Sequence, residues 1–205
     1  MQPDRNFDVV LFVYNGDLPE QQVDLCIKRK GFKFQNFYAF ATTTDIYHYD
    51  AIWIVDDDIQ MSTCDINRMF LLFQEHDLWI AQPVFDKGSL ASWEMTILDE
   101  KYLLRYSNFV ENGVVICARD ALKLCLPVMK DIKSGFGSDF LFPHLIGFPN
   151  RKIALIDDVQ CHHPEGESTL NNLIPRSLHF KDTEDLMEKY KFKYYTPRVT
   201  GGLYR

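Results

Sequence analysis

Three consecutive aspartates, Asp56, Asp57 and Asp58, follow the apolar segment 51–55. Adjacent carboxylates repel one another, so proteins usually offset that cost with a cation or with hydrogen-bond donors. In an open α/β sheet, ligands bind beyond the carboxyl ends of the strands, where we expect this triplet to lie. If the strand continued, Asp56 and Asp58 would face one side and Asp57 the other. We interpret the triplet as half of a divalent metal site; an acidic turn facing solvent is the alternative.

Two adjacent histidines, His162 and His163, end a second apolar segment that begins at residue 152. A neutral imidazole is a suitable ligand for Mn²⁺. Neighbouring residues of a strand point in opposite directions, so we expect at most one histidine to bind a metal, and the spacing does not choose between them. The alternative is that both only bond to the backbone. Cys161 indicates zinc weakly, because a tetrahedral zinc site needs more thiolates.

Asp139 lies behind two glycines, Gly135 and Gly137, at the expected start of a helix. Glycine lets the backbone approach a substrate closely, and Ser138 is a residue type that caps helices. We predict that Asp139 is a general base. The alternative is that it only balances the positive end of the helix dipole.

The elements that must position these residues alternate along the chain. Apolar runs predict strands at 8–14, 37–41, 51–55, 78–81, 113–117 and 152–156, and helical spacing predicts helices at 20–30, at 65–75, from 119 and from 138. This order predicts an α/β fold with a mostly parallel central sheet flanked by helices. We expect one main domain at 1–170. Residues 171–205 are expected to form a C-terminal helical extension packed on it, with a helix at 183–190 and then a tail or the start of a linker.

Composition narrows the class of protein. A length of 205 residues with 46% hydrophobic residues suits a single domain. The five cysteines form an odd set without a C-x-x-C pair, which argues against a disulfide framework. A net charge of −7 disfavours nucleic-acid binding. With no long apolar run and no signal-peptide pattern, we expect a soluble, cytoplasmic protein without a membrane span.

Taken in order, these pieces resemble the GT-A nucleotide-sugar glycosyltransferases. The resemblance rests on the aspartates at 56–58, the segments 109–113 and 118–122, the glycine-rich turn 135–139, and the strand ending in histidine at 156–163. The chain looks most similar to small plant and bacterial members and to glycosyltransferase domains of large algal viruses. The resemblance spans residues 8–163 and implies a Rossmann-related, GT-A-like fold for the main domain, which would be catalytic.

The resemblance also implies roles for individual residues. Val13, Tyr14, Asn15 and Tyr38 would hold the nucleotide, together with Asp56 and Asp57. Asp58, with Asp56 and either His162 or His163, would hold Mn²⁺ or Mg²⁺ on the diphosphate. Asp139 would deprotonate the acceptor hydroxyl if the enzyme inverts.

The implied activity is transfer of a hexose or deoxyhexose from a nucleoside-diphosphate sugar to a glycan or sugar hydroxyl, and uridine is the base we expect. The segment 87–105 lies outside the matching pieces. Within it, Trp93 and Glu94 offer an aromatic face and a carboxylate, and we expect them to contact the acceptor.

Two other classes of protein stay open. A haloacid-dehalogenase-type phosphohydrolase also carries D-x-D at a strand end, with Asp157 and Asp158 as a later acidic pair. That family expects Thr or Val where this chain has Gln60, and it places the motif on the first strand. The second alternative is a calcium-dependent sugar-binding module without catalysis, but the alternation of strands and helices does not suit it, because such modules are often rich in β-structure.

Overall fold

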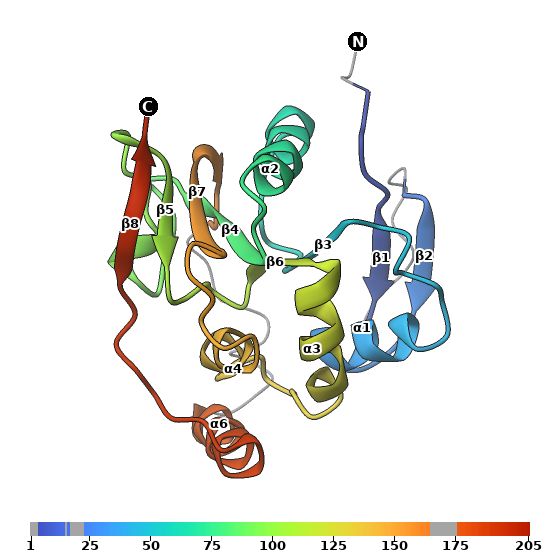
Figure 1. Cartoon of the computed structure of the whole chain (residues 1–205). Helices are drawn as coiled ribbons and strands as arrows, with labels where there is room; N and C mark the ends of the chain where they lie inside the picture. The colour runs from blue at the N-terminus through green and yellow to red at the C-terminus, as the bar shows by residue number, and fades with distance from the viewer. Residues whose placement is uncertain (1–3, 15, 17–22, 165–175) are drawn as a thin grey trace.

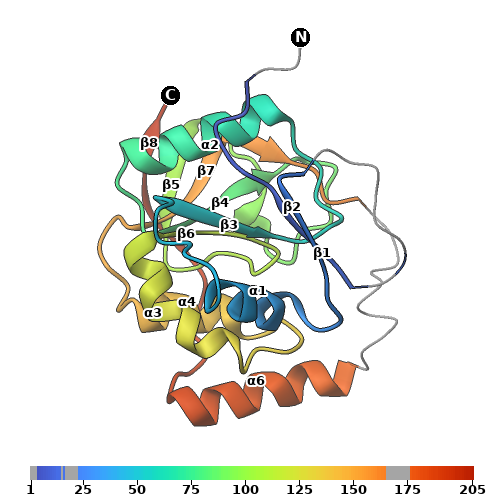
Figure 2. The ribbon, with the colours of Figure 1, turned by 90° about the vertical axis from the view of Figure 1, so that its right-hand side faces the viewer.

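A computed structural model describes residues 4–14, 16, 23–164 and 176–205. Within these residues a central sheet lies between two helical layers (Figures 1 and 2). The strands are β1 (Val10–Val13), β2 (Leu25–Lys28), β3 (Ala51–Val55), β4 (Ile80–Phe85), β5 (Tyr102–Ser107), β6 (Val114–Ala118), β7 (Ile153–Cys161) and β8 (Val199–Tyr204). The helices are α1 (Lys33–Ala41), α2 (Thr63–Glu75), the short 3₁₀ helix η1 (Glu94–Thr96), α3 (Arg119–Met129), α4 (Ser138–Leu145) and α6 (Arg176–Tyr190).

The main sheet has the strand order β3-β6-β4-β7-β5-β8. Of the neighbouring strands in it, only β4 and β7 pair in parallel, whereas the other neighbours are antiparallel. Strands β3, β4, β7 and β8 therefore share one direction, and β5 and β6 run the opposite way. The predicted α/β fold is confirmed, but the sheet is mixed. A separate parallel pair, β1 and β2, lies at the β3 side of the molecule (Figure 1).

Helices cover both faces of the sheet (Figure 2). On one face, α2 buries Met69, Leu72 and Phe73 against the sheet, and Ser62 caps its first turn by accepting a hydrogen bond from the backbone N–H of Asp65. On the other face lie α1, α3 and α4, with α6 against them. Burying a large apolar side chain contributes about 1.5–3 kcal/mol, so both helical layers help to fix the sheet.

Two predicted elements were wrong. Residues 37–41 belong to α1 rather than to a strand, because Phe34, Phe37 and Ala41 are buried with the spacing of one helical face. The segment 20–30 contains strand β2 instead of a helix; residues 20–22 lie outside the described part. A short apolar run fits the period of a helix as well as that of a strand. Here the pairing with β1 makes the segment a strand.

The C-terminal segment contributes to the sheet. We predicted a helix at 183–190, and it is longer, beginning at Arg176. Residues 199–204 form β8, which pairs with β5 at the edge of the sheet, where the sequence had suggested a tail or linker. The last strand therefore closes the sheet on the side away from β3 (Figure 1).

Candidate active site

Asp56 follows β3 and is held by two other segments. Its backbone N–H donates to the carbonyl of Gly113 over 2.9 Å, and its carboxylate pairs with the Lys33 ammonium at 2.6 Å. Lys33 begins α1 and also donates to the carbonyl of Asn112 over 2.8 Å. The lysine thus joins the end of β3 to the turn before β6 and balances one of the three aspartates.

Asp57 faces the end of β1. The Tyr14 hydroxyl donates to the Asp57 carboxylate over 3.1 Å, and the pKa of Tyr14 is raised by burial and by that carboxylate. Tyr14 stays 39% exposed, whereas Val13 before it is buried. Asn15 lies outside the described residues. An exposed aromatic ring beside the aspartates is therefore available to a ligand.

Asp58 faces His163, which follows the end of β7. The His163 Nε2 lies 3.4 Å from an Asp58 carboxylate oxygen, and its Nδ1 lies 2.7 Å from the carbonyl of Leu90. A carbonyl oxygen can only accept, so Nδ1 carries the proton and Nε2 presents its lone pair toward Asp58 when the ring is neutral. A carboxylate oxygen and an oriented imidazole nitrogen facing each other suit a divalent ion.

His162 points to a different partner. Its Nδ1 lies 2.9 Å from the carboxylate of Asp86, which also accepts from the Ser89 hydroxyl at 2.8 Å. Although burial acts in the opposite direction, the hydrogen bonds from Ser89 and His162 lower the pKa of Asp86. The structure thus separates the two histidines, and only His163 faces the aspartate triplet.

Backbone pairing brings the two loops together. Gln60 and His162 exchange hydrogen bonds of 2.9 and 2.8 Å between their main chains, in an isolated antiparallel bridge. The loop after β3 is therefore tied to the end of β7. This bridge sets the separation of Asp58 from His163.

Asp139 occupies the first turn of α4. Gly137, in the left-handed conformation with φ of 84°, is the N-cap, so Ser138 is not the cap that we predicted. Burial, and after it the nearby charge of Glu111, raise the pKa of Asp139 to about 7, against the opposing effect of backbone N–H donors. A carboxyl group with a pKa near neutrality can accept a proton at physiological pH.

Glu111 is a site residue that the sequence signalled only weakly. Its side chain accepts from the Thr96 hydroxyl at 2.7 Å, and burial raises its pKa. Its backbone N–H donates to the buried Gln82 side chain over 2.6 Å. Lys33 and Asp86 were not predicted from the sequence either, because their partners, Asp56 and His162, are distant from them in the chain.

The other three predicted residues are Tyr38, Trp93 and Glu94. Trp93 packs against the core, with its ring centre 5.4 Å from that of Phe109 and 6.3 Å from that of Phe140, the residue after Asp139. Glu94 is exposed at the start of η1. Tyr38 is in the middle of α1 and packs against the core, so its predicted position after a strand was wrong. Among the described residues, the contacts found for these three side chains do not link them to the aspartates.

A search against models of known protein families found no match, and a search of curated protein sequences found none either. In the described ranges, no three His, Cys, Asp or Glu side chains converge to hold a metal ion, and no helix is long and apolar enough to cross a membrane.

Proposed function

We propose that this protein is a metal-dependent glycosyltransferase of the GT-A type, which transfers a sugar from a nucleoside-diphosphate sugar to a glycan hydroxyl. The observation that carries this proposal is the pairing of Asp58 with His163, in which the carbonyl of Leu90 fixes the ring. The mixed α/β sheet, with acidic residues beyond the end of β3, supports the same conclusion.

Asp58 and His163 suit a metal ion whose remaining ligands come from a substrate. Mg²⁺ and Mn²⁺ are commonly held by one or two protein side chains, with phosphate oxygens and water completing the shell. When bound, such an ion would neutralise negative charge on the leaving diphosphate. The side chains of Asp58 and His163 would hold it.

The other residues near the triplet suit the donor nucleotide. Tyr14 presents an exposed ring beyond β1, against which a base can stack, and its hydroxyl is oriented by Asp57. Lys33 brings a positive charge to Asp56 at the same edge of the sheet. In this proposal Tyr14 positions the base, and Asp56 and Asp57 position the ribose.

Asp139 is the proposed base. With a pKa of about 7, a substantial fraction of its carboxyl groups is ionised at neutral pH and can take the proton of an acceptor hydroxyl. The hydroxyl oxygen then attacks the anomeric carbon of the donor, the bond to the diphosphate breaks, and the proton stays on Asp139. This sequence of events gives inversion at the anomeric carbon.

The phosphohydrolase alternative depends on a second acidic pair, at Asp157 and Asp158. The Asp157 carboxylate accepts two bonds from Arg105, of 2.9 and 2.8 Å, and a third from the backbone of Asp99. Asp158 pairs with Arg68 at 3.0 Å. Both carboxylates therefore have structural partners, which favours the glycosyltransferase over the phosphohydrolase.

A test is release of UDP from a panel of UDP-sugars, measured with Mn²⁺ and with EDTA, in the presence of a mixture of oligosaccharide acceptors. We expect one UDP-sugar to be consumed only with Mn²⁺, and Asp58→Asn to abolish this reaction. Asp120→Asn, which removes an exposed aspartate on α3, is the matched control and should retain activity. Turnover of nitrophenyl phosphate without turnover of any UDP-sugar would contradict the proposal.

A further inference from the structure

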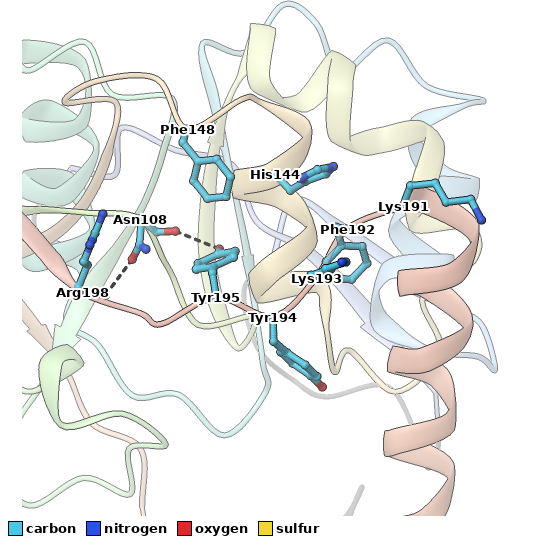
Figure 3. Close-up of a pocket in the computed structure, with 9 residues that line it drawn as sticks. All are labelled: Asn108, His144, Phe148, Lys191, Phe192, Lys193, Tyr194, Tyr195 and Arg198. Atoms are coloured by element: carbon cyan, nitrogen blue, oxygen red, sulfur yellow. Dashed lines mark hydrogen bonds between the residues drawn. The ribbon is translucent and has the colours of Figure 1, made fainter.

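A hollow lies beside α4 and the segment that joins α6 to β8, and none of the three aspartates lines it. Its volume is about 490 Å³, within the usual range for small-ligand pockets. Its lining residues are Asn108, His144, Phe148, Lys191, Phe192, Lys193, Tyr194, Tyr195 and Arg198 (Figure 3). None of them is acidic, although the chain carries a net charge of −7.

Among the residues that the structure describes, the three strong cations of this pocket have no anionic partner. In the described part of the chain, no carboxylate lies within 4.0 Å of the charged groups of Lys191, Lys193 or Arg198. Lys189, just before them, pairs with Asp131 at 2.8 Å. A concave site with unpaired cations and no acids attracts an anion from solution.

Aromatic rings add a second kind of surface. Phe148 and Tyr195 meet edge to face, with ring centres 5.1 Å apart (Figure 3). Phe148 is 41% exposed and Tyr194 is 55% exposed. An aromatic face is electron-rich and packs well against the C–H face of a sugar ring, whereas guanidinium and ammonium groups bind carboxylate, sulfate or phosphate. Together these surfaces suit a charged carbohydrate.

The pocket shares a wall with the turn that carries the proposed base. The Tyr195 hydroxyl donates to the carbonyl of Asn108 over 3.0 Å and lies 3.5 Å from the carbonyl of Asp139. The rings of Tyr194 and Tyr195 also pack edge to face on Phe140, with centres 4.8 and 5.0 Å away. A ligand held by these tyrosines is therefore held next to the start of α4.

We infer that this pocket binds an acidic sugar of the acceptor glycan, an inference that rests on the function proposed above. Arg198 and Lys193 would bind the anionic group, and Tyr195 would support the sugar ring. The net charge of −7 on the whole chain makes a long nucleic acid an unfavourable ligand. The acceptor is thus assigned to the class of uronate-, sulfate- or phosphate-bearing carbohydrates.

The test is calorimetric titration of the full chain with trigalacturonic acid and with neutral galactotriose, without nucleotide. We expect the acidic trisaccharide to bind at least about tenfold more tightly, because charge-assisted hydrogen bonds add to the stacking. Lys193→Gln/Arg198→Gln should remove that preference while leaving the melting temperature unchanged. Lys123→Gln/Lys130→Gln, which removes the same charge from α3 and its C-cap, should keep the preference.

Equal affinity for the two trisaccharides, no binding of either, or full affinity in Lys193→Gln/Arg198→Gln would overturn the inference. Titration of the unaltered protein with UDP and Mn²⁺ reports separately on the donor site. Acidic-sugar binding without any UDP binding would leave the pocket in place and refute the glycosyltransferase. UDP binding with no acidic-sugar preference would refute only the assignment of the acceptor.

Discussion

At the scale of single residues, Asp139, the proposed base, carries a cost in stability. Burial, and then the charge of Glu111, raise its pKa from an ordinary 3.8 to about 7. Between these two values the folded protein holds a proton that the unfolded chain has released. The free energy of unfolding therefore falls as pH rises through this interval. An active-site base commonly carries such a cost.

Asp139→Asn should reverse this cost. The amide carries no charge, so the variant should gain stability relative to the unaltered protein as pH rises from about 4 to about 8, while it loses transfer by roughly 10²–10⁴-fold. Thermal unfolding at both pH values measures the first effect. Asp120→Asn is the control, because Lys123 lowers the pKa of that carboxyl. A stability difference that does not change with pH would contradict the raised pKa of Asp139.

At the scale of elements, the site depends on a close contact between the end of β3 and the start of β6. A Cβ atom at Gly113 would lie 2.9 Å from the Asp56 carboxylate, so a larger residue would push that carboxylate away. The displaced Asp56 carboxylate would lose its ion pair with Lys33. Glycine at this position therefore lets the two elements approach closely enough to place Asp56.

Gly113→Ala should weaken UDP binding by roughly tenfold while the free energy of unfolding changes by less than about 1 kcal/mol. The reason is that the clash involves a movable side chain rather than the backbone. Gly88→Ala is the matched control, since its Cβ would lie an ordinary 3.6 Å from Asp86. Calorimetry and urea unfolding measure the two quantities, and unchanged UDP affinity in Gly113→Ala would show that Asp56 does not contribute to binding.

The sequence predicted the elements whose apolar residues form unbroken runs. The predicted strand 51–55 is β3, and the predicted strand 152–156 overlaps the first half of β7; polar residues of the site follow both strands. The helical period of α1 was hidden because Phe34 and the aromatic run at 37–40 suit either structure. The partners of the site residues, such as Leu90 and Lys33, could not be predicted, because only the folded chain brings them close.

At the scale of the whole molecule, the C-terminal strand is part of the sheet. Residues 199–204 include two glycines, which disfavour strands, so β8 could not be predicted from the sequence. A Cβ at Gly202 would lie 2.7 Å from the Tyr102 ring, so this tight packing on β5 requires glycine. Arg205, after the strand, donates to the carbonyls of Tyr102 and Asp157.

Removal of residues 199–205 should therefore lower stability by about 2 kcal/mol or more, seen as a fall of at least about 4 °C in Tm. The deletion leaves β5 with an unpaired edge and removes the packing of Tyr204 on Tyr102. Thr200→Ala, an exposed change within β8, should leave Tm nearly unchanged and serves as the control. A shortened chain with the original Tm would mean that β8 is dispensable to the fold.

The most direct test of the donor site is titration with UDP in Mn²⁺ and in EDTA, comparing the unaltered protein with His163→Gln and His162→Gln. We expect UDP to bind only with Mn²⁺ and His163→Gln to weaken binding by about 10–100-fold, as for loss of a metal ligand or its support. His162→Gln should bind within about threefold of the unaltered protein, since that ring bonds to Asp86. Binding that is independent of Mn²⁺, or lost in His162→Gln and kept in His163→Gln, would contradict the proposed metal site.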